Sequence, residues 1–181
     1  LASAALHELG EKSITALSDD SDRARLASAF YPLTRDAVLR AHPWNFALVR
    51  KALAQDATAP VFEFAYSYTL PTDPYCLRVW RTNWTGLPTW KIEAHALLTD
   101  KASVSILYIA RIADTEKFDS LFAEALIARL AARLAFPVTG QRNLAETLWL
   151  LYREKINEAR SIDGQEGRPD ELTANFLTEV R

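Results

Sequence analysis

Three histidines and one cysteine are the side chains in this sequence that most often bind metals or attack substrates. His7, His42, His95 and Cys76 lie in four separate segments, and no two histidines have a spacing that would face them toward one metal ion. A Cys/His zinc cluster of ordinary spacing cannot be built from this set, and a single cysteine cannot form an internal disulfide. We therefore expect no metal site and no cofactor.

Paired carboxylates are a second possible source of chemistry. Glu63 and Glu93 could serve as the acid and base of a hydrolase acting on cell-wall sugars, but both alternate with other residues in strand-like segments, where charges facing solvent are expected. The sequence has only five glycines, and it contains neither a Gly-x-Ser-x-Gly element nor a phosphate-binding loop. We expect no enzymatic activity, and a virion-associated hydrolase stays as an alternative.

Tryptophan and arginine side chains are candidates for binding another protein. Trp80 and Trp84, with Trp90, surround a loop, and they either form a contact surface or cover the open face of a small sheet. Arg40 and Arg78 are candidates for an interface or for an internal ion pair. The sequence leaves both pairs of alternatives open.

The composition is that of an ordinary folded domain. The 181 residues are 49% hydrophobic and 24% charged, with a formal net charge of −2. This balance is not typical of a protein that grips nucleic acid, so we expect only brief contact with DNA. The apolar runs are far shorter than the roughly 20 residues that cross a bilayer, so we expect no membrane association.

The sequence pattern of residues 1–59 predicts helices. Apolar residues recur at helical spacing between Arg23 and His42, and a further short helix is expected from Trp44 to Ala54. Trp44 and Phe46 are expected to anchor the core.

Residues 60–111 predict a small antiparallel sheet. Aromatic and apolar residues alternate with others from Phe62 to Leu70, as in a strand with one buried face. Further strands are expected at Leu77 to Arg81, Trp90 to Ala94 and Ser103 to Ala110, with a turn at Asp100 and Lys101.

Helical spacing returns in residues 112–161. A central core helix is expected from Lys117 to Ala135, ended by Pro137, and a second helix from Thr139 to Ser161. The order of helices, sheet and helices predicts an α+β fold, mainly a helical bundle with an inserted antiparallel sheet.

Residues 162–181 are expected to form an extended C-terminal arm. Gly164, Gly167 and Pro169 separate this segment from the preceding helix. Beyond them an apolar stripe predicts a short amphipathic helix that needs a surface to lie on. The arm either docks on a neighbouring subunit or partner protein, or folds back on its own bundle. The expected contact residues are Leu172, Phe176, Leu177 and Val180.

Several segments in order are similar to one known family. They include Ala5 to Leu17, then Arg35 to Ala47 with the element Pro-Trp-Asn-Phe-Ala, Tyr68 to Val79 with Leu-Pro-Thr-Asp, Leu107 to Arg111, and Phe118 to Leu126. Together they resemble the tail tubular protein A family of short-tailed bacteriophages, also called head-to-tail adaptor or gatekeeper proteins. The resemblance extends over nearly the whole chain.

The resemblance implies a structural virion protein. Such a protein would be made in the cytoplasm of a host bacterium and would form a ring, twelvefold in the family, at the head-tail junction. Its partners would be the portal protein, the tail nozzle protein and its own copies, and viral DNA would pass through the ring without specific binding. By analogy with the family, the C-terminal arm would dock on the portal. A cellular protein-binding module, which would be monomeric, is a further alternative.

Overall fold

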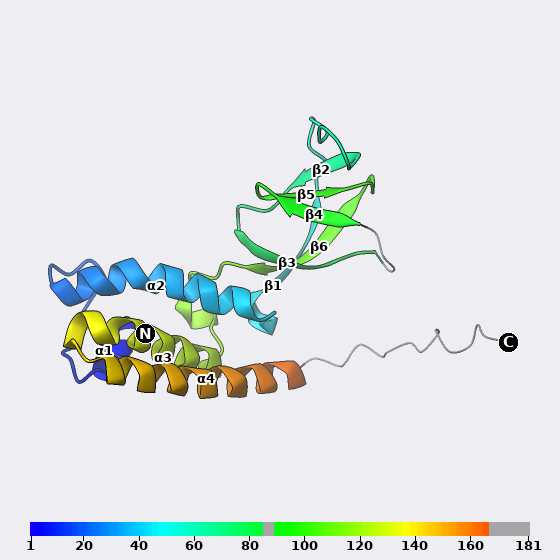
Figure 1. Ribbon diagram of the computed structural model, residues 1–181. Helices are drawn as coiled ribbons and strands as arrows, with labels where there is room; N and C mark the ends of the chain where they lie inside the picture. Colours follow the sequence, from blue (N-terminus) through cyan, green and yellow to red (C-terminus); the bar gives the residue numbers. More distant parts are fainter. Residues whose placement is uncertain (85–88, 167–181) are drawn as a thin grey trace.

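The computed structural model describes residues 1–84 and 89–166 and has an α+β fold (Figure 1). Helices precede and follow the strands along the chain, as the sequence predicts. In space the helices pack together at one end of the molecule and the sheets lie at the other. The helices are α1 (Ala2–His7), α2 (Asp22–Ala41), α3 (Ser120–Thr139) and α4 (Arg142–Gln165).

Helix α3 is the centre of the helical core, because it contacts α1, α2 and α4. The predicted core anchors Trp44 and Phe46 lie against it. Trp44 is fully buried, its Nε1 donates to the Val38 carbonyl (3.1 Å), and its ring meets the Phe122 ring edge-on with centroids 5.1 Å apart. Phe46 is partly buried and also contacts Phe122 (5.0 Å). The expectation that both residues anchor the core is confirmed.

Polar caps and a glycine set the ends of these helices. The Ser21 side chain accepts from the Ala24 N–H at the start of α2, and Asp119 accepts from two N–H groups at the start of α3. We expected Pro137 to end α3, and this was wrong, because the helix continues to Thr139. Gly140, at φ 72°, ends it instead. A proline in the last turn removes only one of the helix's final hydrogen bonds, so the helix tolerates it.

The helix expected from Trp44 to Ala54 is wrong. A short 3₁₀ turn, η1 (Asn45–Ala47), leads directly into strand β1 (Leu48–Leu53). β1 pairs antiparallel with β6 (Val104–Ala110), more than 50 residues away in sequence. The sheet region therefore begins at Leu48, before residue 60.

The strands form two three-stranded antiparallel sheets rather than one. The first has the order β1-β6-β3, with β3 at Cys76–Thr82. The second has the order β2-β5-β4, with β2 at Tyr66–Thr69, β5 at Ala96–Thr99 and β4 at Trp90–Glu93. The expected strands at 77–81, 90–94 and 103–110 are confirmed, whereas β5 was not predicted.

The strand expected from Phe62 to Leu70 is only partly confirmed. Regular pairing begins at Tyr66. Residues 61–63 instead form a tight turn, in which Glu63 has φ 73° and the Phe64 N–H donates to the Phe62 carbonyl (2.9 Å). The alternating apolar pattern therefore begins four residues before the strand that pairs with β5.

Strand β6 connects two separate cores. Ile109 belongs to the helical core, whereas its neighbour Tyr108 belongs to a second core between the sheets. Tyr68 and Leu97 from the second sheet and Val79 from the first complete that core. Successive strand residues point to opposite faces, so one buried strand can serve both cores.

Helix α4 continues to Gln165, past Gly164, so the C-terminal arm does not begin at residue 162 as expected. Asp163 holds this last turn in place. Its Oδ1 accepts from the Asn45 N–H (2.9 Å), and its Oδ2 lies 2.9 Å from His42 Nε2. These contacts join the end of α4 to the connection between α2 and β1.

Candidate protein interface

The predicted contact residues Arg40 and Arg78 lie together where α2 meets the first sheet. Arg40 Nη1 donates to the Leu77 carbonyl (3.2 Å), and Arg78 Nη1 donates to the Arg40 carbonyl (3.3 Å). Each guanidinium thus holds the backbone of the other segment. These contacts join the helical bundle to the sheet, and the expected role of the two arginines at a protein interface stays a prediction.

The predicted tryptophans have different environments. Trp80 and Trp90 are each 37% exposed, and the Arg78 guanidinium lies over the Trp80 ring at 4.9 Å. Trp84 is partly buried and packs against the core between the sheets. Trp80 thus keeps an exposed surface, whereas Trp84 contributes to covering the sheet. The expected arm residues Leu172, Phe176, Leu177 and Val180 lie outside the described residues.

A second junction between bundle and sheets surrounds Asp36, and sequence reasoning missed it. The Asp36 carboxylate accepts from Arg35 (2.8 Å) and from Arg111 Nε (2.8 Å). The Arg111 guanidinium also lies over the Tyr75 ring at 4.3 Å, and Tyr75 stacks on His95. Residues from α2, from the end of β6 and from two loops meet here, so this cluster fixes how the sheets sit on the bundle.

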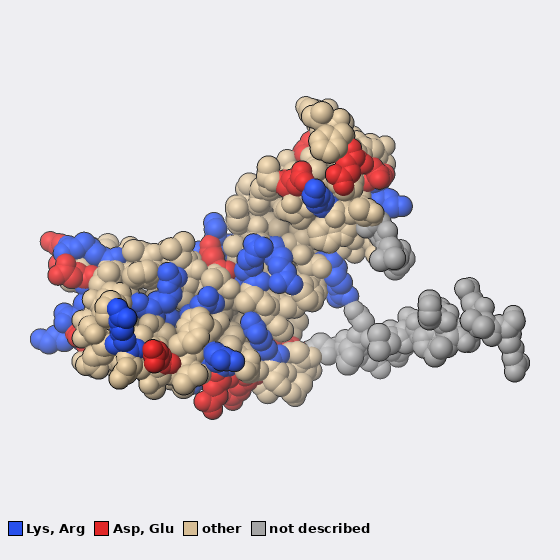
Figure 2. Space-filling view, viewed as in Figure 1, with Lys and Arg blue, Asp and Glu red and all other residues tan. Residues whose placement is uncertain are grey.

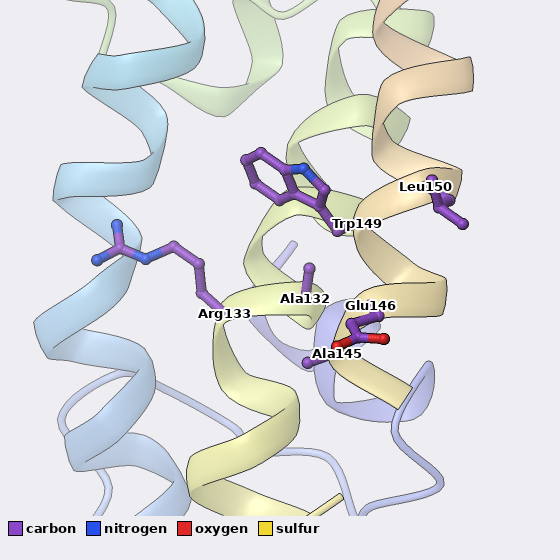
Figure 3. Close-up of a pocket in the computed structure, with 6 residues that line it drawn as sticks. All are labelled: Ala132, Arg133, Ala145, Glu146, Trp149 and Leu150. Carbon is purple, nitrogen blue, oxygen red and sulfur yellow. The ribbon is translucent and has the colours of Figure 1, made fainter. Parts of the chain in front are cut away.

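Helices α3 and α4 enclose an apolar groove of about 520 Å³ near the turn that joins them. It is lined by Ala132, Arg133, Ala145, Glu146, Trp149 and Leu150. Figure 3 shows the Trp149 ring extending from α4 across α3, while Arg133 extends from α3 toward α2. Trp149 is 43% exposed and Leu150 is 63% exposed. Large apolar side chains exposed together in this way are typical of protein interaction sites.

The sequence contained a signal for this groove that we did not use. Residues 148–151 are four consecutive large apolar residues, Leu-Trp-Leu-Leu, in a helix that is otherwise amphipathic. A helix turns 100° per residue, so such a run cannot lie on one face. Leu148 is buried, and the next two residues therefore reach the surface.

The turn at residues 61–63 is a second exposed apolar feature. Val61 is 98% exposed and Phe62 is 78% exposed, and Glu63 beside them is exposed as well. This turn lies between β1 and β2, far from the turn between α3 and α4 (Figure 1). In Figure 2 lysine and arginine are scattered over the bundle, which also has some acidic patches, and aspartate and glutamate gather over the second sheet.

A pocket of about 370 Å³ lies on the first sheet and has both polar and apolar lining residues. Arg50 and Arg81 pair with the same residue, Leu107, from its two sides, so they project from one face. Thr82, Asn83 and Ser105 also line this pocket. Its two guanidinium groups suit an anion better than an apolar side chain.

The candidate carboxylates for catalysis are exposed to solvent, whereas the candidate thiol is buried. Glu63 and Glu93 are exposed, and Glu93 pairs with Lys91 (2.7 Å). Cys76 is buried, and burial raises the pKa of its thiol to about 11. At neutral pH this thiol keeps its proton and is a poor nucleophile.

Within residues 1–84 and 89–166, no group of three His, Cys, Asp or Glu side chains could hold a metal ion. Within the same ranges no helix has the length and apolar character needed to span a membrane.

The chain matches no protein-family model, and no curated protein matches it.

Proposed function

We propose that this chain is a structural virion protein, a head-to-tail adaptor that assembles as a ring between the portal and the tail nozzle and lets DNA pass. The observation that carries this proposal is an agreement between sequence and architecture. The ordered segments that resemble the adaptor family imply a helical bundle with a β insertion. In this chain the helices precede and follow the strands in sequence. Trp44 and Phe46, within the most distinctive of those segments, pack in the core.

The surface of the bundle supports an assembly role. The groove exposes Trp149 and Leu150 to water, which is unfavourable for a protein that stays alone. Covering this apolar surface with another protein would lower the free energy. In the assembly proposed here another protein surface covers it. The exposed positions of Glu63 and Glu93 favour this role over that of a hydrolase, whose general acid works best in a sheltered cleft.

Light scattering with a candidate portal protein tests the proposal. We expect the full chain to form a ring-sized complex with the portal and expect a chain ending after Glu166 to lose it. This end point keeps Asp163, which contacts His42 and Asn45, so the truncation leaves the described contacts of α4 intact.

A point variant separates docking by the arm from a general effect of truncation. Phe176→Asp should weaken the complex as the truncation does, because it places a charge in the predicted apolar stripe. Ala174→Asp adds the same charge on the opposite side of that predicted helix and should leave the complex intact. A full chain that stays monomeric and ignores the portal would contradict the proposed function.

A further inference from the structure

We infer that neighbouring copies of this chain join head to tail, with the turn at residues 61–63 of one copy seated in the groove between α3 and α4 of the next. This inference rests on the proposed function, since it names the contact that would build the ring. Its occupant is a second copy of the chain.

Both surfaces are apolar and exposed. Val61 and Phe62 project almost fully into solvent, and the groove is lined by alanines, by Trp149 and by Leu150. The turn is also held in shape, because the Phe64 N–H bonds back to the Phe62 carbonyl and Phe64 itself is buried. An ordered apolar projection loses little conformational entropy when it enters a groove.

Charged side chains of opposite sign lie beside the two surfaces. Glu63 brings a negative charge beside Phe62, and the groove has Arg133 in its lining and Arg142 nearby on α4, where its guanidinium lies 5.3 Å from the Phe136 ring centroid. Glu146 also lines the groove, one helical turn after Arg142. Arg133 extends toward α2, where it donates to Thr34 Oγ1 (3.2 Å), so Arg142 is the cation at this end of the groove that would face Glu63.

The positions of the two surfaces require two copies of the chain. The turn and the groove lie at opposite ends of the molecule (Figure 1), so one copy cannot use its own turn to fill its own groove. Contact between two different surfaces of identical subunits repeats from copy to copy. Such a contact yields a ring when the rotation that relates one copy to the next closes after a full turn, and an open filament when it does not.

Two charged variants in the full chain test the contact. Phe62→Asp damages the turn and Leu150→Asp damages the groove, and each should reduce self-association at least tenfold, measured by light scattering across a concentration series. Ile162→Asp is the matched control, because Ile162 is 45% exposed on α4 but lies outside the groove. Equal association of all three variants would overturn the inference. Circular dichroism of each variant checks that it is folded.

Mixing the two damaged variants gives the most specific result. A Phe62→Asp copy keeps its groove, and a Leu150→Asp copy keeps its turn, so the mixture should form one-to-one dimers and nothing larger. A contact between identical surfaces would give no such dimer. Absence of the dimer, or growth of larger species, would overturn the inference.

Reversed charges give an independent check. Glu63→Arg and Arg142→Glu should each weaken association, and the two together should restore it if these residues face each other. If both single variants assemble normally, the charge argument is wrong. A portal complex that assembles normally from Phe62→Asp and Leu150→Asp chains would reject this contact and leave the proposed function standing, whereas a chain that never assembles would reject both.

Discussion

The two cores that meet at β6 differ in how completely they are covered. The helical core is closed by long helices and aromatic contacts, yet its surface keeps an apolar groove with Trp149 and Leu150 exposed. The core between the sheets is smaller and includes tyrosines whose hydroxyls donate to backbone carbonyls, Tyr68 to Lys101 (2.7 Å) and Tyr108 to Pro74 (3.2 Å). Apolar surface is therefore exposed on both regions, at the groove of the bundle and at Val61 and Phe62 beside the sheets, and the sheet core differs in having tyrosine hydroxyls that hydrogen-bond to the backbone.

The largest expected effect is in the helical core. Trp44→Ala should lower the free energy of unfolding by about 3–5 kcal/mol, because it leaves a cavity against Phe122 and removes the donor to the Val38 carbonyl. Denaturant unfolding measures the loss. Trp80→Ala is the comparison on the sheet, where the half-exposed ring should cost far less. Equal losses would show that the two regions depend on their aromatic residues to the same degree.

The next effect is at the connection between α4 and β1. Asp163→Ala should cost about 1–3 kcal/mol, because the partly buried hydrogen bonds that its carboxylate makes with the Asn45 N–H and the His42 ring are lost. Glu158→Ala, an exposed change on the same helix, is the control. A loss no greater than that of the control would mean that this contact does not hold the end of α4.

The core between the sheets should respond to alkaline pH. Burial raises the pKa of the Cys76 thiol from 9.0 to about 11, so the unfolded chain releases this proton at a lower pH than the folded chain. The contribution of the protonated thiol to the free energy of unfolding is therefore fully present below pH 9, and it is lost as the pH rises toward 11. The drop in unfolding free energy between pH 8.5 and pH 10.5 should be smaller in Cys76→Ala. An unchanged drop in that variant would refute the account.

The smallest effect concerns one hydroxyl. Tyr68→Phe should cost roughly 0.5–1.5 kcal/mol, because the Lys101 carbonyl loses its donor while the ring stays packed. Tyr66→Phe, at a less buried position in the same strand, should be nearly neutral. If both variants have the unfolding free energy of the wild-type chain, the hydrogen bond from Tyr68 does not stabilise the sheet core.

The sequence predicted those elements whose pattern is long or strictly local. Periodicity located α2, α3 and α4, because each has an apolar stripe sustained over many residues. It misassigned β1, whose six residues become a strand only by pairing with distant β6, and it missed the four-residue strand β5. Such short segments depend on tertiary partners that no local pattern records.

The candidate interface was predictable only in part. Arg40, Arg78 and Trp80 do lie together, but which backbone carbonyls the arginines bind follows from how α2 meets β3. The contact of Asp163 with Asn45 joins residues 118 positions apart and has no signal in the sequence. The groove had a local signal in residues 148–151, whereas the exposed Val61 and Phe62 were assigned to a strand-like region because alternation continued there.

Native mass spectrometry of the full chain with a purified candidate portal ring tests the central claim most directly, because it counts adaptor copies on each ring. The account predicts one fixed number of copies on each portal ring, with few partly filled rings, because neighbouring copies hold one another. Portal rings that carry no copies, beside a monomeric chain, would contradict it.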